Sequence, residues 1–262
     1  MIKFLTLFAF TASMLYAQMS VRKIDSDILD EASGLLISKK YPGVFWSHND
    51  SGDKARLYAF DMKSLKLIKK IKVKKAKNRD WEDLSYHKGK IVIGDFGNNK
   101  NRRENLRIYT IDEPNPYTDK KVKVISKQKF IFSDQKSSIF RRKNFDCEAM
   151  YSFNDKLFLL SKHRADTNTT LYVLKGSKAK KITQYTLDDR VTSADSDGRY
   201  VVILTYKSLY LIEPKGDNIF DYPIKRKILG SVGQVEGVAI DGDMIYVISE
   251  DGKFYNLHVK DF

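Results

Sequence analysis

The sequence predicts an all-β fold built from a repeated unit of short strands. Three strand patterns recur five times in the same order, and the spacing between copies leaves room for four strands in each. No stretch after residue 17 has apolar residues at helical spacing. Four antiparallel strands repeated at this period are typical of a propeller blade. We therefore expect a five-bladed β-propeller of four-stranded blades.

Each copy begins with a small or acidic residue placed just before an apolar strand. The five starting residues are Ser33, Glu82, Glu148, Ser193 and Glu236. Successive copies are 49, 66, 45 and 43 residues apart. The first strand of each blade lines the central channel of a propeller, so these side chains are expected to surround one axis.

Two further strands follow in every copy. An apolar run begins 8 to 11 residues after the starting residue, and a strand with a central tyrosine comes next. The tyrosines are Tyr58, Tyr109, Tyr172, Tyr210 and Tyr255. Residues 65–73 and 122–132 are expected to form fourth strands, because apolar and polar residues alternate in both.

The ends of the chain predict how the ring closes. The last copy stops at Phe262 after three strands, whereas residues 19–30 precede the first copy without belonging to it. We expect this segment to supply the outer strand of the last blade, which would hide a sheet edge. Two alternatives stay open: a six-bladed ring with a degenerate blade in residues 125–145, and a sandwich of irregular strands.

The first 17 residues predict export. Lys3 precedes an apolar run over residues 4–10, and Ala17 supplies a small residue at the cleavage point. This pattern is typical of a secretory signal peptide and is too short to remain as a membrane span. Residues 18–262 would then be a single periplasmic or secreted domain, and one cysteine excludes an internal disulfide.

The net charge of +14 comes from 47 Lys plus Arg against 33 Asp plus Glu. Lys69-Lys70 and Lys74-Lys75 are expected on solvated outer strands. For an exported protein this charge favours a small anionic ligand over nucleic acid. We expect a monomer with no nucleic-acid partner and no integral membrane span after signal cleavage.

Three glutamates that converge on a narrow axis would repel one another unless a cation neutralised them. Calcium suits such oxygen ligands, and no His or Cys cluster indicates zinc. The predicted calcium ligands are the five starting residues, Ser33, Glu82, Glu148, Ser193 and Glu236. The alternative is that each glutamate caps the backbone of a neighbouring blade.

The loops after the second strands, and those between blades, are expected on the same face of the ring. Asp50, Asp80 and Asp95 would orient or deprotonate an attacking water molecule. The predicted substrate-binding residues are Asn49, Arg79, Asn98, Asn99, Arg103, Arg142, His163, Arg164 and Lys207. Taken singly, these Asn- and Gly-rich loops are also ordinary turns.

Two resemblances support these expectations. The segments 46–52, 80–84 and 94–99, with Glu113-Pro114, resemble a group of secreted bacterial propeller proteins of uncharacterised function. The Ser, Glu, Glu, Ser, Glu order of the starting residues is similar to that of calcium-activated apyrases, five-bladed propellers that hydrolyse nucleoside di- and triphosphates. The chain departs from that family at Asn49-Asp50 and at Lys162-His163-Arg164, so the resemblance implies shared architecture more than a shared reaction.

The expected function is therefore that of an exported, calcium-binding propeller that hydrolyses a small phosphoester or phosphoanhydride. The alternative is a non-catalytic binding or scaffold propeller in which calcium stiffens the ring. A third reading, a lactonase-like hydrolase, would need a sixth blade.

Overall fold

The computed structural model describes residues 20–24, 28–135 and 144–262. The predicted signal peptide, residues 1–17, and the predicted substrate ligand Arg142 lie outside these ranges. The described residues form β-strands and two single-turn 3-10 helices, Ile219–Asp221 and Val259–Asp261. No helix in this part of the chain is long and apolar enough to cross a lipid bilayer. The prediction of an all-β, propeller-like fold is confirmed.

Antiparallel pairing groups the described strands into units of four. Unit 1 contains β2 (Ala32–Ile37), β3 (Val44–Asn49), β4 (Arg56–Asp61) and β5 (Leu67–Lys74). Unit 2 contains β6 (Trp81–His87), β7 (Lys90–Asp95), β8 (Leu106–Ile111) and β9 (Lys121–Phe132). Unit 3 contains β10 (Asp146–Phe153), β11 (Lys156–Lys162), β12 (Asn168–Lys175) and β13 (Lys178–Thr186). Unit 4 contains β14 (Val191–Ser196), β15 (Val201–Thr205), β16 (Ser208–Ile212) and β17 (Ile224–Ile228).

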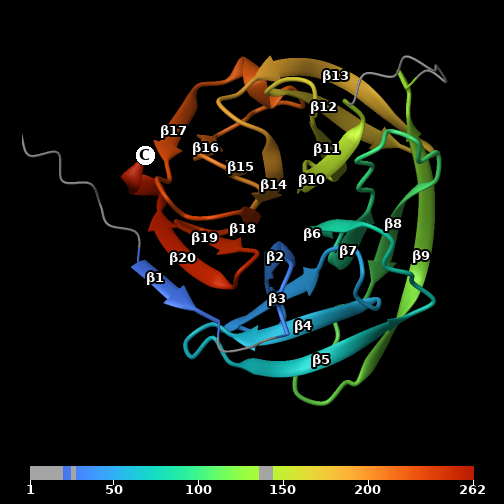
Figure 1. Ribbon diagram of the computed structural model, residues 1–262, viewed down its shortest axis with the longest axis vertical. Helices are drawn as coiled ribbons and strands as arrows, with labels where there is room; N and C mark the ends of the chain where they lie inside the picture. Colours follow the sequence, from blue (N-terminus) through green and yellow to red (C-terminus); the bar gives the residue numbers. More distant parts are fainter. Residues whose placement is uncertain (1–19, 25–27, 136–143) are drawn as a thin grey trace, which may run out of the picture.

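Unit 5 joins the two ends of the chain. It contains β18 (Val235–Asp241), β19 (Met244–Ser249), β20 (Lys253–His258) and β1 (Ser20–Lys23). Strand β1 pairs antiparallel with β20, with Val21 opposite Tyr255, so the first described strand covers the edge that the last one would expose. Figure 1 shows the blue β1 beside the red β20.

The units are arranged around a common centre, with the first strand of each on the inside (Figure 1). These inner strands contact one another in the order β2, β6, β10, β14, β18 and again β2. The buried apolar side chains fall into five clusters, each shared by two neighbouring units. The faces of each unit are therefore buried against its neighbours on both sides, as the apolar runs in the second strands require.

The repeated tyrosines of the third strands are buried and have similar partners. Tyr109 and Tyr210 donate hydrogen bonds to Asp95 and Asp188, over 3.5 and 2.8 Å. Tyr58 and Tyr172 donate in the same way to Asp53 and Asp134. Tyr255 instead donates to the carbonyl of Val232 over 2.9 Å. Each of these buried phenols has an acceptor, as a buried hydroxyl group requires.

The outer strands of units 1, 2 and 3 are linked by short parallel pairings. Lys72 and Lys74 of β5 lie opposite Lys121 and Lys123 of β9. Residues Lys178 and Ala179 of β13 pair with the far end of β9. The expected fourth strands at 65–73 and 122–132 thus correspond closely to β5 and β9, and β9 bridges the two neighbouring units.

Candidate functional site

A β-bulge interrupts every inner strand at the same point. The register skips one residue between β2 and β3, and likewise in the first pair of each other unit. The extra residues are Gly34, Glu82, Glu148, Thr192 and Glu236. A bulge re-aims a side chain that would otherwise alternate across the sheet. Three glutamates therefore occupy equivalent positions around the centre.

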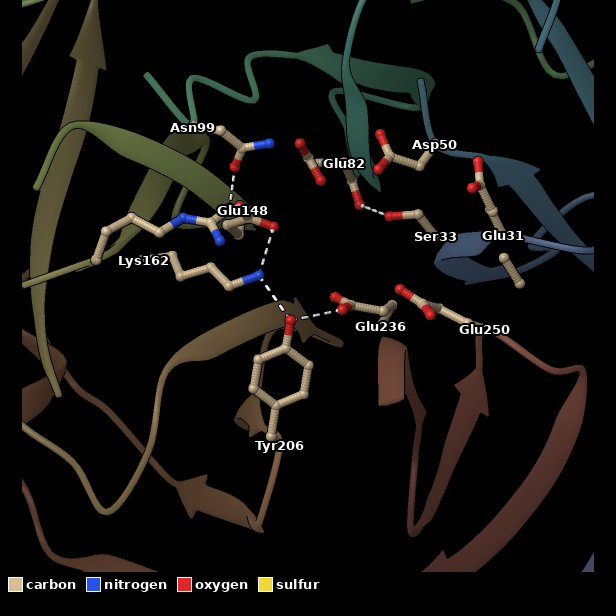
Figure 2. Close-up of a pocket in the computed structure, with 12 residues that line it drawn as sticks. Glu31, Ser33, Asp50, Glu82, Asn99, Glu148, Lys162, Tyr206, Glu236 and Glu250 are labelled. Atoms are coloured by element: carbon tan, nitrogen blue, oxygen red, sulfur yellow. Dashed lines mark hydrogen bonds and ion pairs between the residues drawn. The ribbon is translucent and has the colours of Figure 1, made fainter. Parts of the chain in front are cut away.

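A cavity of about 160 Å³ lies where these bulges meet. Figure 2 shows side chains from all five units directed into it. Its lining residues are Glu31, Ala32, Ser33, Asp50, Glu82, Asn99, Glu148, Lys162, Arg164, Tyr206, Glu236 and Glu250. Most come either from the start of a first strand or from the loop after a second strand. Six carboxylates against two cations make this cavity acidic, although the chain as a whole is basic.

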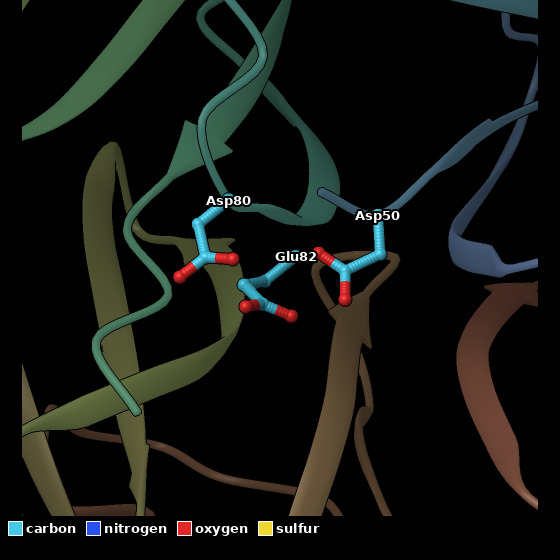
Figure 3. A group of neighbouring side chains, drawn as sticks. All are labelled: Asp50, Asp80 and Glu82. Carbon is cyan, nitrogen blue, oxygen red and sulfur yellow. The ribbon is translucent and has the colours of Figure 1, made fainter. Parts of the chain in front are cut away.

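Asp50, Asp80 and Glu82 form an acidic trio at one side of this cavity (Figure 3). One carboxylate oxygen from each lies within 4.8 Å of the other two. Asp50 follows β3, whereas Asp80 and Glu82 flank the start of β6. Two oxygen ligands at 2.3 to 2.6 Å from one Ca²⁺ can be at most about 5 Å apart, so this spacing is within reach of a single ion.

Glycine at residue 97 lets the loop after β7 approach the trio closely. A Cβ atom at Gly97 would lie 1.9 Å from Oε1 of Glu82 and 2.6 Å from the carboxyl group of Asp80. Any side chain here would therefore displace both carboxyl groups. The backbone of this loop packs directly against two members of the acidic trio.

A buried lysine neutralises the opposite side of the cavity. Nζ of Lys162 lies 3.3 Å from Oε2 of Glu148 and donates a hydrogen bond to the Tyr206 hydroxyl over 2.8 Å. Tyr206 in turn donates to Oε1 of Glu236 over 2.8 Å. Both Lys162 and Glu148 have side chains only 4% exposed. The chain of contacts joins units 3, 4 and 5 (Figure 2).

The cavity shifts the pKa of most of its acids upward. Burial, followed by the neighbouring carboxylate of Asp50, raises the pKa of Asp80 to about 6. Burial raises the pKa of Glu236 to about 7. Burial and Glu148 hold the pKa of Glu82 well above its ordinary value, and burial and Asp146 do the same for Glu148. These acids favour the neutral form or a compensating cation.

The pKa of Lys162 is also raised, which for a lysine favours the charged form. Burial alone would lower its pKa, but the carboxylates of Glu148 and Glu236 outweigh burial and raise it. The ammonium group therefore stays charged and serves as an internal counterion. It neutralises only part of the acidic lining.

The structure brings seven of the predicted site residues to the cavity lining and places one more beside it. Those in the lining are Ser33, Asp50, Glu82, Asn99, Glu148, Arg164 and Glu236, and Asp80 completes the acidic trio. Arg164 donates through Nε to Asp146 over 2.6 Å and lies 3.2 Å from Glu148. Ser33 donates to the carbonyl of Glu82 over 2.7 Å, so its hydroxyl links units 1 and 2.

Ser193 lies one position beyond the bulge of β14. Its hydroxyl donates to Oδ1 of Asp83 over 3.1 Å and accepts from the backbone of Val238, away from the cavity. The residue equivalent to the glutamates is Thr192, whose hydroxyl has no hydrogen-bond partner among the described residues. A bulge cannot be located from apolar spacing alone, and an error of one residue reverses the face of the strand.

Three further predicted site residues, Asp95, Asn98 and Arg103, make contacts within the loop after β7. Asp95 is fully buried and pairs with Arg103 and Arg107, at 2.8 and 3.6 Å. Asn98 accepts from the backbone of Arg103 and donates to the carbonyl of Phe145. These contacts hold the loop after β7 in place beside the acidic trio.

The remaining predicted residues lie outside the cavity lining. Asn49 donates to the carbonyl of Ile28, and His163 contacts Asp166 and Thr170 through its two ring nitrogens. Arg79 is exposed, and Lys207 is exposed and lies 3.2 Å from Asp189. Their proposed contacts with substrate stay predictions.

Four charged or phenolic lining residues were not predicted: Glu31, Lys162, Tyr206 and Glu250. Lys162 and Glu250 belong to loops that the sequence places on this face, but nothing local distinguishes them from other surface charges. Tyr206 precedes the fourth repeat tyrosine strand and has no repeated counterpart. Lys162 and Tyr206 acquire their roles from partners in other units.

No protein-family model and no curated protein matches the chain. Among solved structures, the chain is similar to a virginiamycin B lyase from Staphylococcus aureus, with 13% identity and a TM-score of 0.44. That match covers 87% of this chain and 66% of the lyase. A luciferin-regenerating enzyme matches with 11% identity and a TM-score of 0.49, covering 91% of this chain and 95% of the enzyme.

Proposed function

We propose that the chain is a five-bladed, calcium-binding β-propeller whose metal lies at the acidic end of its channel. The five units would be the blades, and β1 would close the ring as the outer strand of the last one. The cyclic order of inner-strand contacts and of apolar clusters supports this count. The described part of residues 125–145 lies mainly in β9, which favours five blades over six.

The observation that carries the proposal is the acidic trio. Asp50, Asp80 and Glu82 offer oxygens within 4.8 Å of one another, and the glycine at residue 97 lets the loop after β7 pack directly against two of these carboxyl groups. A divalent cation would relieve the repulsion that raises the pKa values of Asp80 and Glu82. Such a donor set of hard oxygens, from separate loops and strands, suits Ca²⁺ better than Zn²⁺.

Glu148 and Glu236 would act as more distant charges, since both already contact the Lys162 and Tyr206 pair. Thr192 occupies the equivalent bulge position in unit 4. Ser193 is not part of the proposed ligand set, because its hydroxyl is engaged by Asp83 and Val238.

A hydrolytic role is favoured by the cations across the cavity from the trio. Lys162 and Arg164 line the same cavity, so a small phosphoester or phosphoanhydride could contact both the metal and a basic side chain. A bound cation would supply the charge that activates water and stabilises a developing oxyanion. Asp80, as one of the ligands, would orient that water molecule. Asp95 would have no direct role, because it is buried against Arg103 and Arg107.

The alternative is a scaffold propeller in which calcium only stabilises the ring. It is favoured by the ion pairs that engage Lys162 and Arg164 with Glu148 and Asp146. In that case the metal would tie unit 1 to unit 2 through Asp50 and Glu82, without turnover of any substrate.

Calcium titration calorimetry and thermal unfolding test the proposal. We expect binding by the unaltered chain and at least about a tenfold weaker affinity for Glu82→Gln, which is about 1.4 kcal/mol. Calcium at 100 times its Kd should stabilise the fold by about 2.7 kcal/mol. The matched control is Asp217→Asn, which removes an exposed partner of Lys156. Equal affinities of the two variants would contradict the metal site.

Hydrolysis is tested separately with nucleotides and phosphomonoesters as substrates. Turnover that calcium supports and Asp80→Asn abolishes would favour the hydrolase. Calcium binding without turnover of either substrate class would favour the scaffold.

A further inference from the structure

A groove lined mainly by basic residues lies on unit 1, between its second-to-third strand loop and the end of β5. This groove has a volume of about 790 Å³ and shares no lining residue with the acidic cavity. Its lining residues are Asp53, Lys54, Ala55, Arg56, Lys72, Val73, Lys74, Lys75, Ala76, Lys77 and Asn78. Six cations therefore face one carboxylate. Of the cations, only Arg56 pairs with a carboxylate in the described structure, at 4.0 Å from Asp53.

The neighbouring unit extends the charge. Parallel pairing places Lys121 and Lys123 of β9 opposite Lys72 and Lys74 of β5, and all four side chains are exposed. Lysines two residues apart on a strand are about 6.6 Å apart, and adjacent strands are separated by about 4.8 Å. The proximity of Lys121 lowers the pKa of Lys74. The pairing thus creates a double row of ammonium groups beside the groove.

Such crowding is unfavourable in the isolated chain. Like charges directly opposite one another on paired strands destabilise a sheet. No carboxylate of the described residues lies within ion-pair distance of Lys72, Lys74, Lys121 or Lys123. An external polyanion would relieve this repulsion along the whole row and release bound counterions.

We propose that the groove and the lysine rows of β5 and β9 form a binding surface for an acidic polysaccharide. Lysine-rich segments of this kind are typical of heparin-binding or nucleic-acid-binding patches. No aromatic residue lines the groove, so it lacks the stacking platforms with which proteins bind single-stranded bases. Its concave shape suits an extended chain of repeating carboxylate or sulfate groups more than a flat lipid surface.

The surface is independent of the proposed calcium site. Charge reversal at Lys72 and Lys74 should weaken the binding of a heparin oligosaccharide by more than tenfold at 50 mM salt. It should also reduce the dependence of log Kd on log salt by about two, one for each lost contact. Fluorescence anisotropy of a labelled oligosaccharide over 50 to 200 mM salt measures both. Polygalacturonate as a competitor distinguishes a carboxylate from a sulfate ligand.

Lys215→Glu with Lys225→Glu is the matched control, because these exposed residues of unit 4 change the net charge equally. The neutral pair Lys72→Gln with Lys74→Gln, with an unchanged midpoint of thermal unfolding, excludes misfolding as the cause. Equal losses of oligosaccharide affinity in the groove and control variants would show that net charge alone explains the effect, and would overturn the proposal. Tighter binding of duplex DNA or anionic vesicles than of either glycan would overturn it in favour of those partners.

Discussion

Gly97 and Glu82 approach so closely that a Cβ on the glycine would lie 1.9 Å from Oε1 of the glutamate. Both residues belong to unit 2. Gly97 lies in the loop after β7, and Glu82 is the bulge residue of β6. The close approach fixes the carboxyl groups of Asp80 and Glu82 against the backbone of this loop. Only glycine at residue 97 allows them to keep these positions.

Gly97→Ala should therefore weaken calcium binding without removing a ligand. The added methyl group must displace the carboxyl groups of Glu82 and Asp80, and we expect at least a tenfold loss of affinity, about 1.4 kcal/mol. Calorimetry checks this. Gly216→Ala is the control, since its Cβ would come close only to the Tyr222 side chain. Unchanged affinity in Gly97→Ala would place the metal elsewhere.

Lys162→Met should destabilise the fold because it leaves Glu148 buried without its ammonium partner. Breaking a buried pair costs about 3 to 5 kcal/mol. The loss should be smaller at pH 5 than at pH 8, since protonation of Glu148 removes the unpaired charge. Chemical denaturation at both pH values measures it. The double variant Lys162→Met with Glu148→Gln should recover part of the stability, and failure to do so would mean that the two residues are not coupled.

Stability without calcium should fall as pH rises from about 5 to 8. The folded pKa values of Asp80 and Glu236, about 6 and about 7, lie above their ordinary values of 3.8 and 4.5. Acids with raised folded pKa values contribute stability that is complete below the unfolded pKa and lost as pH passes the folded pKa. Thermal unfolding in the presence of a chelator, at pH 5 and at pH 8, measures whether stability falls as predicted.

Added calcium should reverse that trend, because it must displace protons from its proposed ligands Asp80 and Glu82, whose pKa values are raised. Affinity should then increase from pH 5 to pH 8. Affinity that stays constant over this range would contradict ligation by Asp80. Asp217→Asn again serves as a control, because its carboxylate is exposed and paired only with Lys156.

Asp83 is predicted to be essential for the ring itself. Its oxygens accept hydrogen bonds from Met150, over 2.9 Å, from Ser193, over 3.1 Å, and from Ala194, over 3.3 Å. These contacts join the inner strands of units 2, 3 and 4. Asp83→Ala would leave several buried donors unsatisfied, and we expect a loss of about 3 to 5 kcal/mol by urea unfolding. A loss below about 1 kcal/mol would remove Asp83 from this role.

Much of the fold was predictable because its signals are local. Alternation along β5 and β9, the apolar second strands and the buried tyrosines each depend on a few neighbouring residues. The loops that follow β3, β7, β11, β15 and β19 were also expected on one face, and each contributes to the cavity. Glu82, Glu148 and Glu236 were found for the same reason, since each begins a repeated strand.

The tertiary structure decided which side chains meet. In β14 the bulge residue is Thr192 and not the predicted Ser193. Strand periodicity cannot detect this difference of one residue. Lys162 becomes the counterion of Glu148 only because Tyr206 and Glu236, from other units, surround it. The lysines of β5 and β9, 49 residues apart in the sequence, face each other only through the pairing of two outer strands. Periodicity is a property of neighbouring residues, whereas the charge and burial of a site depend on every unit that reaches it.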